Sequence, residues 1–189
     1  MKYYQEKYKE YIESTINSDM TDLLNWFESY IPIGSQRIMD LGFGSGRDSL
    51  YFQGKGYDVC SIDPEVAFCC HGKEIGLKDV RNMKAEDICF QEEFDGIWAC
   101  ASLLHIKKEK LFDVFEKCYK ALKMDGVMYC SFKYGDFEGV RDERYYVDFK
   151  EESFLELISK TRFEIISINI TNDVRPERKE KWLNVLLKK

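Results

Sequence analysis

The sequence lacks the features that anchor, export or crosslink a chain. No apolar run is long enough for a transmembrane helix, and the first six residues lack the apolar core of a signal peptide. The seven cysteines include no C-x-x-C pair and no zinc-ligand spacing. An odd number of thiols, several within apolar runs, is typical of a reducing compartment. We therefore expect a cytoplasmic protein that binds neither a membrane nor a metal.

The chain also lacks an excess of positive charge. Its 28 lysines and arginines are outnumbered by 34 acidic residues, which gives a net charge of −6. That balance argues against a broad phosphate-binding face, so we expect no nucleic-acid partner. No repeat, low-complexity tract or linker divides the 189 residues, of which 44% are hydrophobic. We expect one domain over residues 1–189 with a sizeable core, and the oligomeric state stays open.

The motif that organises the chain follows residues 38–41, which predict a short buried strand. Gly42, Gly44 and Gly46 come next, and a helix is expected to begin at Arg47. Glycines allow strained backbone angles and a close approach to a ligand. The helix N-terminus behind them offers unpaired N–H groups and partial positive charge. A strand, a glycine-rich turn and a helix predict a nucleotide-binding corner.

The glycine spacing distinguishes two kinds of site. A dinucleotide motif, G-x-G-x-x-G, would place its third glycine at position 47, but Arg47 stands there and Gly46 comes one residue earlier. The pattern resembles motif I of class I S-adenosylmethionine-dependent methyltransferases, which implies S-adenosylmethionine as cofactor and S-adenosylhomocysteine as product. The resemblance also implies cofactor contacts from Asp40, Gly42, Gly44 and Gly46. The alternative is an ordinary tight turn between a strand and a helix.

An acid stands where a second cofactor contact is expected. A strand predicted at residues 57–62 ends at Asp63, about twenty residues after the first glycine, the separation at which such an acid meets ribose hydroxyls. A carboxylate accepts two hydrogen bonds from a diol. Asp63, Pro64 and Glu65 also suit a helix start, and the two roles are compatible. We therefore predict Asp63 and Pro64 as cofactor-binding residues.

The remaining cofactor contacts are implied by the resemblance alone. In that family an acidic turn after the third strand, here residues 80–83, meets the adenine. The aligned position holds Lys84, so the chain departs from the pattern, and the role passes to Glu86 or Asp87 nearby. The loop after the fourth strand begins with Ser102, and in relatives this loop lies beside the sulfonium and the substrate.

Methyl transfer is an in-line displacement, so positioning is the main task, and a base is needed only if the acceptor must lose a proton. His105, one of two histidines, follows the fourth strand and has a suitable pKa, although it is alternatively a structural residue that closes the loop. Tyr134 and Asp136 are further candidates, or else they solvate a loop. Arg175 and Arg178 either hold an anionic acceptor group or belong to a solvated turn.

The N-terminal segment, residues 1–30, is polar with interleaved aromatic residues. Tyr4, Tyr8 and Tyr11 fall at helical spacing, which predicts a helix with an aromatic face. A second helix is expected to end before Pro32. Either both helices pack on the sheet, or the first is a lid over the cofactor.

Strands and helices alternate after this segment. We expect strands at residues 38–41, 57–62, 80–83, 94–101, 127–132, 163–170 and 182–187, and helices at 47–54, 64–75, 108–123 and 151–160. This alternation predicts a parallel sheet with helices on both faces, finished by an antiparallel hairpin. It resembles the seven-stranded, Rossmann-like α/β fold of class I methyltransferases across residues 35–189. The run from Gly46 to Phe52 resembles the small tellurite-resistance-type and type 11 methyltransferases.

The resemblance implies methyl transfer to a small-molecule acceptor. A nucleic-acid or protein methyltransferase is the first alternative, against which stand the acidic charge and the absence of an N/D-P-P-Y/F motif. A nucleotide-binding oxidoreductase is disfavoured by Arg47 in place of the third glycine. A catalytically silent module that binds the cofactor is an alternative that the sequence leaves open.

Overall fold

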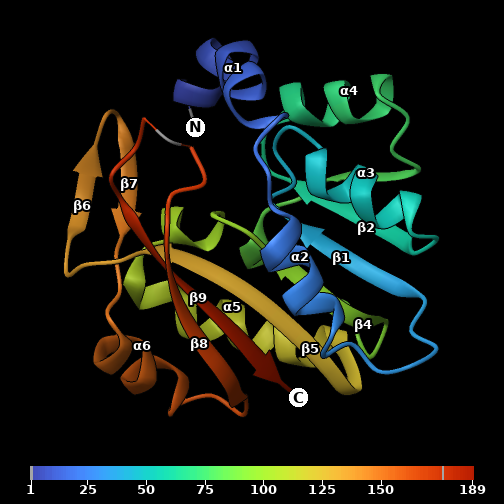
Figure 1. Cartoon of the computed structure of the whole chain (residues 1–189), viewed down its shortest axis with the longest axis vertical. Helices are drawn as coiled ribbons and strands as arrows, with labels where there is room; N and C mark the ends of the chain where they lie inside the picture. Colours follow the sequence, from blue (N-terminus) through green and yellow to red (C-terminus); the bar gives the residue numbers. More distant parts are fainter. Residues whose placement is uncertain (1, 176) are drawn as a thin grey trace.

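The core of the molecule is a seven-stranded sheet in the order β3-β2-β1-β4-β5-β9-β8 (Figure 1). The structure is a computed structural model that describes residues 2–175 and 177–189, with side chains from residue 7 onward. The strands are β1 (Arg37–Leu41), β2 (Asp58–Asp63), β3 (Asp79–Asn82), β4 (Phe94–Ala99), β5 (Leu122–Lys133), β8 (Glu164–Asn172) and β9 (Lys181–Lys188). β1 to β5 are parallel, and β9 is antiparallel to β5 and β8. The expected mostly parallel sheet with a C-terminal antiparallel hairpin is therefore confirmed.

Helices cover both faces of this sheet. They are α1 (Lys2–Thr15), α2 (Thr21–Glu28), α3 (Arg47–Gly54), α4 (Val66–Glu74), α5 (Lys108–Ala121) and α6 (Glu151–Ile158). On one face Phe27 of α2 and Phe52 of α3 pack on Trp98 of β4, with ring centroids 5.3 and 5.8 Å from the indole. On the other face Phe115 of α5 lies 6.1 Å from Phe154 of α6. Successive residues of the central strands supply both layers, because strand side chains alternate between faces.

The first helix packs on α4 at the top of Figure 1, whereas α2 packs on the sheet. The Tyr11 ring lies 5.4 Å from the Phe68 ring of α4. The Thr15 carbonyl, at the C-terminus of α1, accepts a hydrogen bond of 3.0 Å from Arg47. These contacts fix α1 over the glycine-rich turn. The side chain of Tyr4, expected on the same aromatic face, lies outside the described residues.

A two-stranded hairpin follows β5, in a part of the chain for which no strand was expected. It consists of β6 (Glu138–Arg141) and β7 (Arg144–Val147). The turn residues Asp142 and Glu143 have φ values of 47° and 62°. Turns with two positive φ angles usually carry Asn-Gly or Asp-Gly, and an Asp-Glu pair lacks that signal. The turn sequence therefore did not predict this hairpin, which borders the candidate active site.

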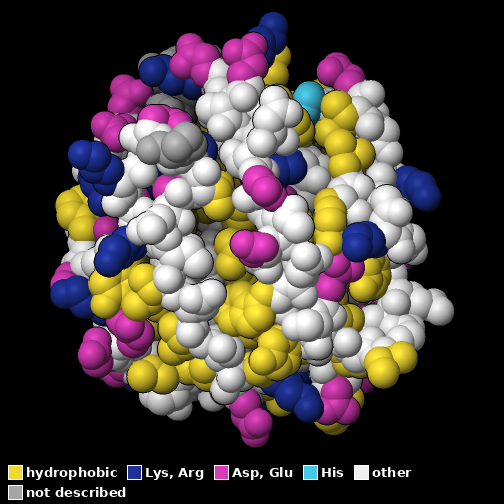
Figure 2. Space-filling model, viewed as in Figure 1, with side chains coloured by type: hydrophobic (Ala, Val, Ile, Leu, Met, Phe, Trp, Pro, Cys, Tyr) yellow, Lys and Arg dark blue, Asp and Glu magenta, His cyan; other side chains and the backbone are white. Residues whose placement is uncertain are grey.

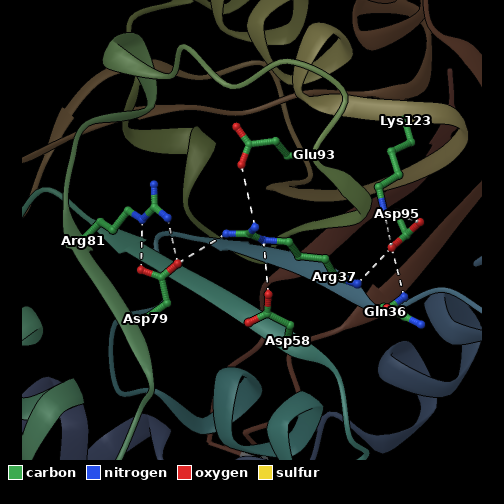
Figure 3. A network of polar contacts seen from close by, with 8 residues as sticks. All are labelled: Gln36, Arg37, Asp58, Asp79, Arg81, Glu93, Asp95 and Lys123. Atoms are coloured by element: carbon green, nitrogen blue, oxygen red, sulfur yellow. Dashed lines mark hydrogen bonds and ion pairs between the residues drawn. The ribbon is translucent and has the colours of Figure 1, made fainter.

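The amino ends of the parallel strands carry an ionic network (Figure 3). Arg37 at the start of β1 lies 3.4 Å from Asp58, 3.6 Å from Asp79 and 3.9 Å from Glu93. Arg81 binds Asp79 through two hydrogen bonds of 2.9 Å. The network joins β1, β2, β3 and the segment before β4 at the edge opposite the glycine-rich turn.

Candidate active site

The glycine-rich turn is tight because neighbouring segments lie against it. Gly42, Gly44 and Gly46 have φ values of 80°, 51° and 80°, a backbone region that residues other than glycine rarely adopt. A Cβ atom on Gly42 would lie 2.4 Å from the Cβ of Ser102. A Cβ on Gly46 would lie 2.6 Å from Ile75. The absence of a side chain at Gly42 thus allows the loop after β4 to pack against the turn. Its absence at Gly46 allows the end of α4 to do the same.

A first cavity of about 360 Å³ opens beside this turn, at the carboxyl ends of β1, β2 and β4. Six of the predicted cofactor residues line it: Gly42, Gly44, Asp63, Pro64, Glu86 and Ser102. Gly46 and Asp87 are absent from its lining, and Asp40 faces a second cavity instead. Glu65 also lines it and is only 4% exposed, although the sequence indicated Glu65 only as part of a helix start. The sequence feature that could have indicated Glu65 as a site residue is its position directly after Asp63 and Pro64.

Asp63 shapes the turn and faces the first cavity at the same time. Its carboxylate accepts hydrogen bonds from the Gly44 N–H at 3.1 Å and from the Glu65 N–H at 2.8 Å. Burial raises the pKa of Asp63 to about 7, and the two N–H donors only partly offset this. The side chain therefore holds the start of the α4 segment and also lines the cavity.

A second cavity of about 320 Å³ lies on the α2 face of the sheet. Its wall combines the α1–α2 segment, the first turn of α3, the ends of β4, β5 and β9, the β7 strand and the link between β8 and β9. Four residues line both cavities: Tyr11, Gly42, Ala101 and His105. The two cavities therefore share one wall, in which the helix α1, the glycine turn and the loop after β4 meet.

His105 lies in that shared wall, in a short helical turn (Leu103–His105). Its Nδ1 is 2.8 Å from the Tyr145 carbonyl of β7. A carbonyl only accepts, so Nδ1 carries the proton and Nε2 carries the lone pair. Burial, with a smaller contribution from Arg144 and Lys133, lowers the pKa of His105 to about 4. The imidazole is therefore neutral at pH 7.

The other predicted substrate-side residues are placed differently. Tyr134 lines neither cavity, and its hydroxyl donates a hydrogen bond of 2.8 Å to Glu151 of α6. Arg175 and Arg178 both line the second cavity. Arg175 binds Asp173 through hydrogen bonds of 2.9 and 2.8 Å, so its charge is largely compensated. The link between β8 and β9 is thereby held against the cavity.

Two neighbouring carboxyl groups in the wall of the second cavity, those of Asp40 and Asp48, have different partners. Asp40 accepts a hydrogen bond of 2.6 Å from Ser49, and burial together with the nearby Asp48 raises its pKa well above the ordinary range. Asp48 binds Arg47 at 2.6 Å and the Trp98 indole N–H at 2.8 Å. Of these two adjacent acids, Asp48 is the one bound to Arg47 in an ion pair. Asp48 was not predicted as a site residue. The only sequence feature that could have indicated it is that it is polar and lies in the first turn of α3.

The structure adds two negative findings. Among residues 2–175 and 177–189 no group of three or more His, Cys, Asp or Glu side chains is arranged to hold a metal ion. None of the described helices is long and apolar enough to cross a bilayer. On the face in Figure 2, the coloured Lys and Arg side chains are scattered among Asp and Glu and form no continuous band.

Residues 38–126, which include the glycine turn and the loop after β4, match the model of a methyltransferase domain family. Over this segment, which is a little under half of the chain, the sequence is similar to S-adenosylmethionine-dependent methyltransferases. An uncharacterized methyltransferase of Staphylococcus carnosus is 26% identical to it over 121 residues, which cover 60% of this chain and 58% of that protein. A phosphoethanolamine N-methyltransferase of Plasmodium falciparum is 23% identical over 150 residues, which cover 74% and 52%. The chain thus spans little more than half the length of either relative.

The fold of the chain also matches solved structures. A 1,6-didemethyltoxoflavin-N1-methyltransferase of Burkholderia thailandensis, bound to 1,6-didemethyltoxoflavin and S-adenosylhomocysteine, has a TM-score of 0.81 and 18% identity. The match covers 98% of this chain and 85% of that one. At this identity the likeness concerns the fold, so the chemistry must be argued from the two cavities.

Proposed function

We propose that this chain transfers the methyl group of S-adenosylmethionine to a small-molecule acceptor. The cofactor binds in the first cavity and the acceptor in the second. The observation that carries this proposal is the wall shared by the two cavities, formed by Tyr11, Gly42, Ala101 and His105. A methyl group crossing that wall travels in line between the two ligands, which is the geometry that displacement at a sulfonium carbon requires.

The residues of the first cavity suit the cofactor. Gly42 and Gly44 line it with backbone alone, and the buried Ser102 hydroxyl has no hydrogen-bond partner among the described residues. Asp63 is proposed to accept hydrogen bonds from the ribose hydroxyls and Glu86 from the adenine amine, while Ser102 binds the amino-acid portion. The bound cofactor supplies an electrophilic methyl group. Gly46 and Asp87 are proposed to act through packing and loop shape.

The size and lining of the second cavity favour a small acceptor. A space of about 320 Å³ suits a compact metabolite better than a duplex or a folded protein. The segment 1–30 is proposed to act as its lid, because Tyr11 on α1 lines both cavities and the Thr15 carbonyl is bound to Arg47. Closure by this lid would exclude water from the transfer.

His105 is the proposed base for acceptors that lose a proton. Its Nε2 has the lone pair, and its lowered pKa keeps the ring neutral at physiological pH. A base with a pKa of about 4 is weak, so it assists a proton transfer that methylation itself drives. Tyr134 is proposed to support the region through Glu151 rather than to contact the acceptor.

The decisive experiment offers the protein S-adenosylmethionine labelled in its methyl group together with a small-metabolite extract. Mass spectrometry should detect a labelled small molecule and S-adenosylhomocysteine. S-adenosylhomocysteine should also raise the melting temperature by mass action, and NAD should leave it unchanged. Stabilisation without any labelled product would identify a silent module, and stabilisation by NAD alone would contradict the cofactor assignment.

A further inference from the structure

Aromatic rings from several elements meet in the wall of the second cavity. Its lining includes six of them: Tyr11, Phe43, His105, Tyr129, Tyr146 and Trp182. Most have ring partners inside the protein. The Tyr129 ring is stacked on Trp98 with centroids 4.0 Å apart, and the Tyr146 ring lies 4.7 Å from His105. Trp182, in contrast, has no ring contact and no cation over its face among the side chains that the structure describes.

Backbone and side-chain contacts fix the position of Trp182. It lies in β9, where its backbone is paired with Lys133 of β5 and with Thr171 of β8. Its indole N–H donates a hydrogen bond of 3.1 Å to Asp173, whose side chain is only 2% exposed. Asp173 is held in turn by Arg175 through hydrogen bonds of 2.9 and 2.8 Å. These contacts set the plane of the indole before a ligand binds, so stacking on it costs little conformational entropy.

The indole is connected to the wall shared by the two cavities through a short series of contacts. Lys133, the residue paired with Trp182, lies 5.2 Å from the centroid of the Tyr146 ring. Directly paired residues project to the same face of a sheet. The Tyr146 ring is in contact with His105, which lines both cavities. A ligand ring on Trp182 would therefore extend past Tyr146 toward His105, where the methyl group is proposed to cross.

The charges of the wall favour a neutral ring over a cation as the occupant. Aromatic walls also bind quaternary ammonium groups, so both classes of ligand must be compared. Five lysines and arginines and four acidic residues line this cavity. Lys133 and Arg144 already lie 5.2 and 5.1 Å from the centroid of Tyr146. A cationic ligand would be repelled by these like charges, whereas an aromatic ring gains stacked and edge contacts with the wall.

We propose that the methyl acceptor contains a planar aromatic ring, which stacks on the indole of Trp182. This inference rests on the proposed function of the second cavity as the acceptor site. Trp182 then selects acceptors by shape, because a flat ring approaches the indole closely over its whole face and a puckered, saturated ring does not. The accepting atom lies at the ring edge nearest to the shared wall.

The test uses the full chain saturated with S-adenosylhomocysteine, whose binding is measured first by calorimetry. Benzamide and cyclohexanecarboxamide are then titrated as probes, because they carry the same neutral amide and differ in the planarity of the ring. Choline is the cationic probe. Benzamide should bind about fivefold or more tightly than cyclohexanecarboxamide, and choline should bind more weakly than benzamide.

Trp182→Leu should weaken benzamide binding about 5- to 100-fold, the range for losing one stacked ring, and Trp182→Phe should keep part of the affinity. Trp26→Leu is the matched control. Trp26 lies in α2, 6.3 Å from the Tyr129 ring, and is absent from the cavity lining, so this variant should keep full affinity. Nicotinamide, a planar ring that quenches indole emission on contact, should quench the parent and Trp26→Leu chains saturably but not Trp182→Phe.

Melting temperatures confirm that each variant is folded, and if Trp182→Leu does not fold, the quenching of Trp182→Phe decides the question. Equal binding of benzamide and cyclohexanecarboxamide, tighter binding of choline than of benzamide, or full benzamide affinity in Trp182→Leu would overturn the inference alone. Saturable quenching that persists in Trp182→Phe would do the same. Absence of S-adenosylhomocysteine binding would instead contradict the proposed function.

Discussion

The amino ends and the carboxyl ends of the parallel strands, called here the amino edge and the carboxyl edge of the sheet, differ in the groups that contact their carboxylates. At the amino edge, Asp79 faces Arg81 and Arg37, and Asp95 accepts bonds from two backbone N–H groups and from Lys123 (Figure 3). These contacts lower the pKa of both acids. At the carboxyl edge, burial raises the pKa of Asp63, whose donors are backbone N–H groups. Asp79 and Asp95 thus have cationic partners, whereas the carboxylate of Asp63 is bound by backbone N–H groups.

The difference follows from what each edge must do. Charges at the amino edge are satisfied within the protein, so they hold the starts of neighbouring strands together. The acids at the carboxyl edge retain lone pairs that face a cavity, and a ligand must complete their environment. An incompletely compensated acid is costly for folding, and it persists where binding uses it. The following experiments address this contrast, beginning with the largest expected effect.

Removing residues 1–17 uncovers the carboxyl edge and leaves the amino edge intact. We expect a folded domain in which cofactor binding is weakened and transfer falls about 100-fold or more, because a small loss of positioning has that effect. Activity of the truncated and full-length chains, measured with the acceptor found in the extract, checks this. Full affinity and turnover in the truncated chain would show that α1 serves only to pack on α4.

Asp63→Ala should weaken S-adenosylhomocysteine binding by about 1–3 kcal/mol, because hydrogen bonds to a charged group are lost. The matched change at the other edge, Asp79→Ala, should leave this affinity unaltered. Calorimetry on both variants compares the edges directly. Unchanged affinity in Asp63→Ala would mean that Asp63 only holds the Gly44 and Glu65 N–H groups in place.

The sequence and the structure agree best where local patterns decide the outcome. The glycine spacing and the strand that ends at Asp63 predicted the first cavity because motif and turn chemistry are local. The second cavity was predicted in part, because the candidates His105, Arg175 and Arg178 line it. Asp48 and Arg144, which also line it, were not predicted. The turn at Asp142 lacks the glycine that announces such hairpins, so the strand that carries Arg144 was unexpected. Contacts between residues that are far apart in the sequence leave no comparable local pattern.

The pH dependence of stability should separate Asp63 from the acids of the other edge. Its pKa is about 7 in the folded chain and about 3.9 in the unfolded chain. The folded state thus binds the proton more tightly, and stability is lost as the pH rises from about 4 to about 7, by at most about 1.4 kcal/mol per pH unit. Asp63→Asn should remove this decline. Parallel unfolding curves for the variant and the parent across that range would contradict the assignment.

The smallest expected effect is at the amino edge, in Asp79→Asn. Its lowered pKa has the opposite sign: the stabilisation is present above about pH 4 and is lost as the pH falls through the folded value. Because the Asp79 and Arg81 side chains are 29% and 36% exposed, solvent screening limits the loss to about 1 kcal/mol or less. Urea unfolding at pH 7 in low and high salt measures it, and high salt should reduce it further.

Asp58→Asn is the control for this last change, because Asp58 contacts the same Arg37 at 3.4 Å with a side chain that is 60% exposed. It should cost less than Asp79→Asn, which also loses two hydrogen bonds from Arg81. S-adenosylhomocysteine affinity should be unchanged in both variants, since sites without shared partners act independently. A change in that affinity would show that the ionic network positions the strand ends on the opposite edge, and the two edges would then have to be treated as one coupled unit.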